Sequence, residues 1–153
     1  MSNTEPASDG GSDVPPGFIP QGRSSPFLAP FEPIWEKPFA EDTAHGPVRG
    51  VIVALRLGPP HLNSKGLAHG ALLTALADIA MGRSLAVASD PPQRCVTVSL
   101  SIDYHAPARA GDWLEARVDH LRAGRKLGFA SCFLMVGDKV VARANGTFSP
   151  VGG

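Results

Sequence analysis

A long and almost entirely apolar segment constrains the fold of this chain more than any other feature. The residues from Ala68 to about Ala88 are predicted to form one helix. Its apolar side chains lie on nearly every side of that helix: Leu72, Leu73, Leu76, Ala77, Ile79, Ala80, Met81 and Leu85. A helix that is hydrophobic all round is buried in the interior of its protein. Other elements must therefore surround it.

Strand patterns supply those elements. Residues 48–58 alternate in polarity and precede the helix, and four more strand-like runs follow it at 94–106, 112–122, 126–136 and 139–149. Short turn sequences separate the four later runs, so we expect them to be antiparallel neighbours, because parallel neighbours need a long crossover. The sequence predicts an α+β fold in which a curved antiparallel β-sheet wraps around one long central α-helix.

The 153 residues fit a single domain with an unusual N-terminal part. Eleven of the 15 prolines fall within residues 1–60. Residues 1–26 are rich in Ser, Gly, Pro and Asp, which predicts a flexible tail. Residues 27–46 contain several aromatic side chains and are predicted to be an arm that packs on the domain, or alternatively a lid over an active site. Residues 47–153 are expected to be the domain itself.

Composition excludes several classes of function. The formal net charge is zero, with 14 basic and 14 acidic residues, so we expect no nucleic acid partner and no membrane partner. Cys95 and Cys132 are isolated, and the first 25 residues lack the apolar core of a secretory signal. These features predict a cytoplasmic protein with reduced thiols and no membrane-spanning run. The histidines and cysteines show no metal-ligand spacing, and no G-x-S-x-G elbow is present, so we expect neither a metal, nor a cofactor, nor a serine hydrolase.

Asp78 lies in the middle of the apolar helix. Burying an unpaired carboxylate costs several kcal/mol even after the surroundings relax. Two interpretations are open. Asp78 lies on a narrow polar stripe with Thr74 and Gly82 and meets solvent or Arg83, or it is a general base or nucleophile.

The start of the same helix suggests a complementary group. A helix N-terminus presents free N–H groups and a partial positive charge, and Gly70 leaves its N–H unobstructed by a side chain. Such a donor can stabilise a carbonyl oxygen that gains negative charge during nucleophilic attack. Asn63, in the preceding loop, can orient a water or the carbonyl. His69 either supports this site or is a structural histidine that hydrogen-bonds the loop.

The spacing of these groups predicts a dimer. Gly70 and Asp78 are eight residues apart, which is about 12 Å along a helix axis. Both must come within roughly 3 Å of the same carbonyl group if both act on it. One helix cannot do this, so we expect two antiparallel helices from two chains of a symmetric homodimer, with two equivalent shared sites.

The segment that begins at Asn63 resembles a known family. Asn63, Gly66, His69, Gly70, Ala71 and Asp78 match the Asn-x-x-Gly-x-x-His-Gly-Gly and Asp pattern of hotdog-fold acyl-CoA thioesterases, in the branch of phenylacetyl-CoA thioesterase and the mammalian thioesterase superfamily proteins. Ala71 replaces the second glycine of the pair. The resemblance covers roughly residues 47–149. It implies a hotdog fold and hydrolysis of an acyl-CoA thioester to a carboxylic acid and coenzyme A.

The resemblance also implies roles for individual residues. Gly70 polarises the thioester carbonyl with support from His69, Asn63 lies beside the carbonyl or the leaving sulfur, and Asp78 of the partner subunit activates water or attacks directly. Thr97 corresponds to a position that orients the water. Two segments are implied in coenzyme A binding: Tyr104, His105, Pro107, Ala108 and Arg109 in one, and Arg122, Gly124, Arg125 and Lys126 in the other. Arginine and lysine suit phosphates, although turn charges are as often simply solvated.

Two other functions remain open on the same fold, because a fold alone does not determine function. One is a non-catalytic acyl-CoA-binding protein, which would be expected to lack the helix carboxylate. The other is a dehydratase that acts on acyl-carrier-protein thioesters, although no His-Phe-Pro-Gly-like stretch is present. For the assembly we expect a homodimer with shared active sites, and a homotetramer formed as a dimer of such dimers.

Overall fold

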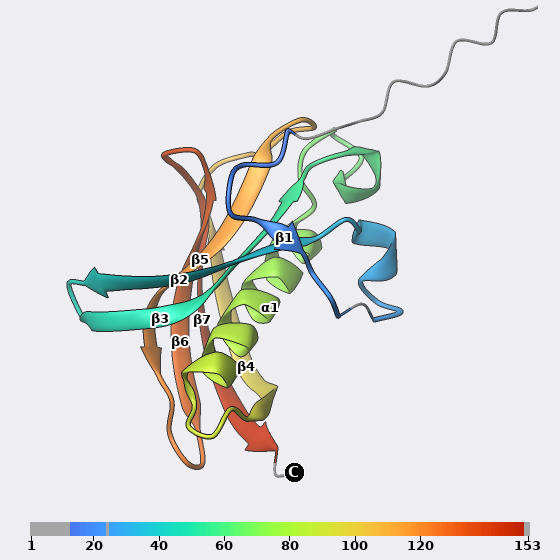
Figure 1. Cartoon of the computed structure of the whole chain (residues 1–153). Coiled ribbons are helices and arrows are strands. Elements are labelled where there is room, and N and C mark those ends of the chain that lie inside the picture. Colours follow the sequence, from blue (N-terminus) through green and yellow to red (C-terminus); the bar gives the residue numbers. More distant parts are fainter. Residues whose placement is uncertain (1–12, 24, 152–153) are drawn as a thin grey trace, which may run out of the picture.

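The computed structural model describes residues 13–23 and 25–151, and in this part of the chain one helix packs against one antiparallel sheet (Figure 1). The helix is α1 (Gly70–Ala88). The strands are β1 (Ile19–Pro20), β2 (Trp35–Thr43), β3 (Gly46–Arg56), β4 (Arg94–Tyr104), β5 (Trp113–Arg122), β6 (Gly128–Val136) and β7 (Lys139–Val151), and two 3-10 turns are η1 (Ala29–Phe31) and η2 (Pro59–His61). The seven strands follow the order β1-β2-β3-β5-β6-β7-β4. The predicted α+β architecture is confirmed.

Helix α1 is buried on one side only. Its buried residues are Leu72, Leu73, Leu76, Ala77, Ala80, Met81, Ser84 and Leu85. They form one core with the inner face of the sheet, where Leu55, Leu114 and Leu134 are fully buried. The opposite side carries Asp78, Ile79 and several small residues, which are partly or fully exposed. The prediction of a helix buried all round was therefore wrong for a single chain, because the curved sheet covers only about half of it.

The composition of α1 also bears on the membrane question. By length and mean hydropathy, 1.5 over its most apolar window, α1 is apolar enough to cross a membrane, although the sequence interpretation expected no such run. Of that window, 44% is buried against the rest of the chain. The core helices of soluble proteins meet the same criterion, so the composition of α1 is weak evidence for a membrane span.

The position of β4 differs from the prediction. The β5–β6 and β6–β7 hairpins form as expected, but β4 pairs with β7 at the edge of the sheet, whereas β5 lies between β3 and β6. The expectation that β4 and β5 are neighbours was therefore wrong. The eight residues between them can extend about 26 Å, and the three strand spacings to be crossed amount to about 15 Å. A connection of this length can cross the end of the sheet instead of forming a hairpin.

The N-terminal segment contributes strands to the sheet. β2 lies within the segment predicted to be an arm, and it pairs with β3 along all nine of its residues. β1 adds two residues to the outer edge of β2 through the pairs Ile19↔Glu36 and Pro20↔Trp35. Part of the predicted flexible tail, residues 1–12 and 24, lies outside the described residues. The arm therefore takes the form of a sheet strand on the side of α1 away from β4.

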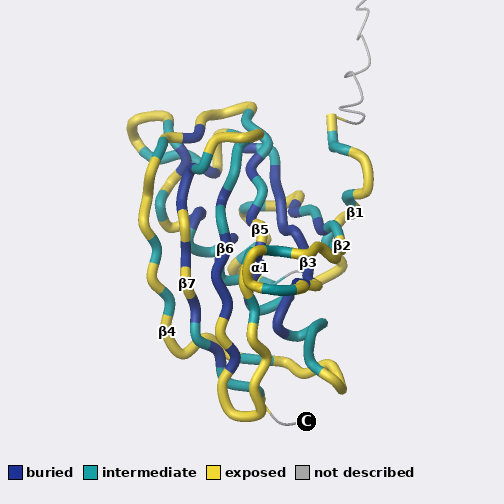
Figure 2. Tube along the Cα trace, turned by 90° about the vertical axis from the view of Figure 1, so that its left-hand side faces the viewer, coloured by how far each residue is buried: buried dark blue, intermediate teal, exposed yellow. Residues whose placement is uncertain are grey.

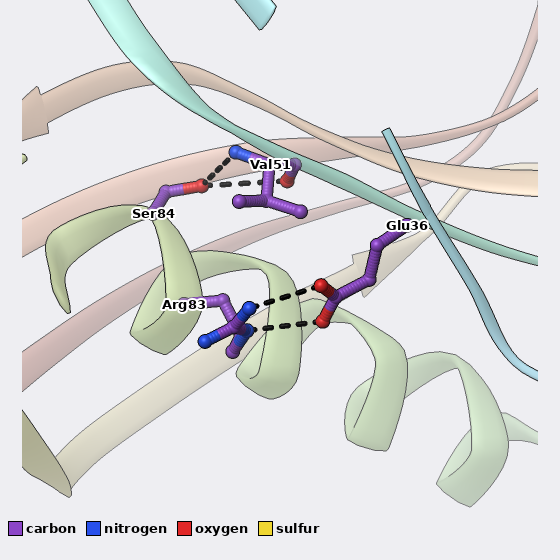
Figure 3. A network of polar contacts seen from close by, with 4 residues as sticks. All are labelled: Glu36, Val51, Arg83 and Ser84. Carbon is purple, nitrogen blue, oxygen red and sulfur yellow. Dashed lines mark hydrogen bonds and ion pairs between the residues drawn. The ribbon is translucent and has the colours of Figure 1, made fainter. Parts of the chain in front are cut away.

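Two buried polar contacts fix α1 against β2 and β3 (Figure 3). The Arg83 guanidinium binds the Glu36 carboxylate with two hydrogen bonds, of 3.0 and 2.9 Å. The Ser84 hydroxyl lies 3.0 Å from the Val51 N–H and 3.4 Å from its C=O. Val51 lies just outside the segment of β3 that pairs with β5, so Ser84 satisfies backbone groups there. A Cβ atom at Gly50 would lie 2.5 Å from the Ser84 Oγ, so glycine permits this close approach.

The other flank of α1 faces β4, which is a free sheet edge. Figure 2 shows that β4 is exposed or only half-buried along its length. Val96, Val98 and Tyr104 are 51%, 58% and 54% exposed. An edge strand that exposes apolar side chains and has no neighbour on its outer side among the described residues is a template for pairing with another chain.

Candidate active site

Asp78 faces β4 in the third turn of α1. The Thr97 hydroxyl donates a hydrogen bond of 2.5 Å to Asp78 Oδ1, within the range of short charge-assisted bonds. Within the described residues, no second group hydrogen-bonds to this carboxylate and no cation pairs with it. Arg83 is engaged by Glu36 on the other side of the helix. The interpretation in which Arg83 neutralises Asp78 was therefore wrong, and Asp78 is half-buried beside a single hydroxyl donor.

Cys95 lies close to the same carboxylate. Burial, and next the negative charge of Asp78, raise the pKa of the Cys95 thiol above its usual value. The Sγ atom lies 3.5 Å from the carbonyl oxygen of Gly82 on α1. A thiol with a raised pKa is a poor nucleophile because little thiolate is present at neutral pH. Cys95 therefore lines the site as a neutral group.

The helix begins with an unusual cap. His69 is the N-cap residue, and its Nδ1 accepts a hydrogen bond of 3.0 Å from the Ala71 N–H. The imidazole thus performs the role that Ser or Asp usually has at this position. The His69 carbonyl accepts the N–H groups of Leu72 and Leu73. Across the described part of the chain, the Gly70 N–H is left without an acceptor, so it is the free donor of the first helical turn.

Asn63 organises the loop that precedes the helix. Its Oδ1 accepts the N–H groups of Lys65 at 2.9 Å and Leu67 at 3.2 Å. Gly66 adopts a φ of +73°, which closes this turn and favours glycine. The side-chain oxygen of Asn63 is therefore already used in the loop, and the side-chain NH₂ is the group that remains for a ligand.

Tyr104 reaches the helix start from the end of β4. Its hydroxyl lies 2.8 Å from Thr74 Oγ1 and 3.0 Å from the carbonyl oxygen of Gly70. Thr97 and Tyr104 thus connect one strand to both predicted catalytic positions, Asp78 and Gly70. Sequence reasoning placed Thr74 on the polar stripe but did not connect it with Tyr104. The i, i+4 spacing of Gly70 and Thr74 indicates that they lie close together on a helix. No local pattern in the sequence indicates that Tyr104 from β4 joins them.

The two predicted coenzyme A segments lie at opposite ends of α1. Residues 104–109 lie beside the helix N-terminus, where the Ala108 carbonyl accepts the Ala68 N–H at 2.8 Å. Gly124, in the other segment, shares a small cavity with Leu85 and Ser89 at the helix C-terminus. A helix of 19 residues is about 27 Å long. One chain therefore does not bring the two segments together.

Side-chain exposure differs within these segments. Arg109, Arg122, Arg125 and Lys126 are exposed, as are His105, Pro107 and Gly124, whereas Ala108 is only 1% exposed. The Pro107 carbonyl accepts a hydrogen bond of 2.8 Å from Lys139 Nζ. The Arg109 N–H binds the Asp112 carboxylate. The basic side chains are available for a ligand, whereas Ala108 can contribute only its backbone.

A single chain does not enclose the candidate site. A hollow of about 430 Å³ lies on the outer face of the sheet and is lined by residues such as His120, Ser131 and Asn145, but not by Asp78 or Gly70. Among the residues that the structure describes, no group of three or more His, Cys, Asp or Glu side chains could hold a metal ion. The chemistry available at α1 is that of a carboxylate and a free backbone N–H.

Comparison with known proteins identifies the family. The model of the thioesterase superfamily matches residues 65–143, which include α1, β4, β5, β6 and the first part of β7. The chain therefore belongs to the thioesterase superfamily, and the hotdog fold expected from the resemblance is confirmed by solved structures of this type.

Individual relatives agree with this assignment. The chain is 44% identical over 138 residues to "Putative esterase PA0474" of Pseudomonas aeruginosa, covering 89% of this chain and 96% of the relative. The crystal structure of TT0310 from Thermus thermophilus has a TM-score of 0.66 and 27% identity, and it covers 84% of this chain and 100% of its own. A variant of the phenylacetic acid degradation protein PaaI from Thermus thermophilus has a TM-score of 0.65 and 26% identity, over 83% and 100% of the two chains. The chain is thus a member of the thioesterase superfamily that is similar to a relative named as an esterase.

Proposed function

We propose that the protein is an acyl-CoA thioesterase that releases a carboxylic acid and coenzyme A. One observation carries the proposal: as far as the described residues are concerned, α1 bears both a carboxylate without a cationic partner, Asp78, and a free N–H donor, Gly70. The first can activate a nucleophile, and the second can stabilise the oxyanion that attack on a thioester carbonyl creates. A protein that only bound acyl-CoA would have no need of this pair.

The reaction follows from these two groups. The thioester oxygen accepts the Gly70 N–H at the positive end of the helix dipole. Asp78 takes a proton from a water while the water oxygen forms a bond to the carbonyl carbon. The tetrahedral intermediate then collapses, the carbon–sulfur bond breaks, and the coenzyme A thiolate leaves and is protonated. In the variant of this mechanism with direct attack, Asp78 Oδ2 forms the new bond, and water hydrolyses the resulting anhydride.

The distance between the two groups supports a shared site. Eight residues separate Gly70 from Asp78, about 12 Å along one helix, so the complete pair comes from two chains. The exposed edge of β4 offers the surface, because two copies of β4 can pair antiparallel across a twofold axis. With the axis midway between Thr97 and Tyr104, Thr97 of one chain lies opposite Tyr104 of the partner subunit. Asp78 then lies beside the Gly70 of that partner.

The same symmetry accounts for the coenzyme A segments. Antiparallel helices place the C-terminus of one α1 near the N-terminus of the other. The turn that contains Arg125 and Lys126 in one chain then approaches residues 104–109 of the partner subunit. Each pocket would thus receive basic side chains from both chains, which suits the phosphates of coenzyme A.

Complementation between two inactive variants tests the proposal. Gly70→Val removes access to the donor and Asp78→Asn removes the base, so each variant alone should release little thiol from acyl-CoA. After joint unfolding and refolding, half of the dimers should be mixed, and each mixed dimer has one site in which both groups are intact. About a quarter of the wild-type activity should return.

Controls make the result decisive. Each variant is refolded alone in parallel, its fold is checked by circular dichroism, and the mixed dimers are counted by native mass spectrometry. Mixed dimers without activity would contradict the shared site. Wild-type protein that binds acyl-CoA but releases no thiol from a panel of aromatic and aliphatic substrates would contradict the hydrolase.

A further inference from the structure

Three oxygen atoms form a compact triangle at the start of α1. The Tyr104 hydroxyl lies 2.8 Å from Thr74 Oγ1 and 3.0 Å from the Gly70 carbonyl oxygen, and Thr74 Oγ1 lies 2.9 Å from that same oxygen. Each hydroxyl has one proton to donate. The two hydroxyls cannot both donate to each other. Whenever both donate within the triangle, at least one of them therefore donates to the Gly70 carbonyl oxygen. The carbonyl of Gly70 is thereby part of one hydrogen-bonded network with side chains from α1 and β4.

The Tyr104 ring also occupies the space where a side chain at position 70 would be. A Cβ atom there would lie 3.2 Å from the Tyr104 hydroxyl oxygen and 3.3 Å from Cζ, which is closer than ordinary van der Waals contact. Gly70 is the first residue of α1, so no left-handed backbone demands glycine. The requirement for glycine comes instead from the close approach of the phenol.

We propose that Tyr104 is a positioning residue for the hydrolysis: with Thr74, its hydroxyl fixes the peptide that joins Gly70 to Ala71 and so orients the preceding peptide, whose Gly70 N–H meets the thioester oxygen. This inference rests on the proposed function of Gly70. His69 holds the same Gly70–Ala71 peptide from its other side, because His69 Nδ1 accepts the Ala71 N–H. Rate enhancement by a fixed donor falls steeply when its position is loosened, so an anchor on this turn affects turnover more than binding.

The proposal also gives β4 a defined role. Thr97 hydrogen-bonds Asp78, and Tyr104, seven residues later on the same strand, holds Gly70. A single edge strand thus sets the positions of both predicted catalytic groups. This role differs from the contact with coenzyme A that the family resemblance implies for Tyr104, and the two roles have different kinetic consequences.

Tyr104→Phe separates these roles, because it keeps the ring and removes the hydroxyl. A positioning role predicts that kcat falls about five- to tenfold with KM nearly unchanged, to the same extent on acyl-CoA and on an N-acetylcysteamine thioester without the nucleotide. Thr74→Val should have a similar effect. The double variant should lose little more than the larger single loss, since both hydroxyls serve one carbonyl. A rise in KM confined to acyl-CoA would overturn the proposal in favour of a coenzyme A contact.

A second cycle tests the requirement for glycine. Gly70→Ala should lower both kcat and the thermal midpoint. Both losses should be much smaller in a Tyr104→Ala background, where the phenol is gone. Equal costs in both backgrounds would overturn the proposal. Coupling in the thermal midpoint without coupling in kcat would also overturn it, because the contact would then serve stability alone. If instead both couplings appear while Asp78→Asn retains full turnover, the positioning of Gly70 stands and the proposed role of Asp78 fails.

Discussion

The two flanks of helix α1 differ in how their polar groups are used. On the flank toward β2 and β3, Glu36 is 8% exposed and Ser84 is fully buried, and both are bonded to partners within the chain. On the flank toward β4, the Thr97 hydroxyl is the one hydrogen-bond donor to the Asp78 carboxylate among the described residues, and both side chains lie at an open sheet edge. The first arrangement stabilises the fold, because buried polar groups are costly when unpaired. The second leaves hydrogen-bonding capacity for a substrate and a surface for a second chain.

The largest effect on activity is expected at Asp78, on the flank toward β4. Asp78→Asn keeps the shape of the side chain and its contact with Thr97 but removes the base, so thiol release should fall by about 10²–10⁴-fold. The thermal midpoint should hardly change. Asp138→Asn, the same substitution in the exposed β6–β7 turn, should be normal in both measurements. Near-normal turnover of a folded Asp78→Asn protein would remove Asp78 from the mechanism.

At Glu36, on the flank toward β2 and β3, we expect a loss of stability without a loss of activity. Glu36→Ala leaves Arg83 without its partner, which should lower the free energy of unfolding by about 1–3 kcal/mol, less than for a fully buried pair because Arg83 is partly exposed. The activity of the folded protein should be unchanged. Glu41→Ala on the same strand is the matched control, because its contact with Arg117 is exposed and such pairs contribute about 0–1 kcal/mol. Urea unfolding measures all three proteins. Equal stabilities for the two variants would show that the buried pair does not hold β2 to α1.

A smaller effect is expected at the β5–β6 turn. If the sites are shared, this turn of one chain contributes to the site on the β4 flank of the partner subunit. Arg125→Ala combined with Lys126→Ala should raise the KM for acyl-CoA about five- to tenfold with little change in kcat, since phosphate contacts bind substrate and transition state alike. A short thioester that lacks the nucleotide should be hydrolysed as by the wild type. Lys65→Ala, in the exposed loop before α1, is a control for the loss of an exposed basic side chain elsewhere. Equal losses on both substrates would show that these residues do not bind phosphate.

The smallest effect concerns the thiol beside Asp78. The negative charge of Asp78 is one cause of the raised pKa of Cys95, so Asp78→Asn should lower that pKa. More thiolate is then present at pH 8, and alkylation of Cys95 by iodoacetamide should become about two- to fivefold faster. Burial raises the pKa of Cys132 to about 12, with a contribution from Asp119, so Cys132 should stay unmodified in both proteins. An unchanged rate at Cys95 would indicate that its burial outweighs the charge of Asp78.

The sequence by itself determined the helix, five of the seven described strands and the catalytic candidates. The apolar run that ends before Asp90-Pro91 defined α1 to within a few residues, because a segment of this composition has to pack against other elements. The spacing of Gly70 and Asp78 was sufficient to predict that one chain cannot complete the site, since helical rise is fixed by backbone geometry. These properties are local, and the chain encodes them within a few turns.

Only the tertiary structure decided which segments meet across the sheet. It placed β4 beside β7 instead of β5. The sequence left this choice open, because a connection of eight residues is long enough for either arrangement. That placement brings Thr97 to Asp78 and Tyr104 to Gly70, and it separates the two predicted coenzyme A segments by the length of α1. It also directs Arg83 to Glu36, a partner 47 residues away. Contacts between distant segments depend on packing a shared core, so no local pattern in the sequence specifies them.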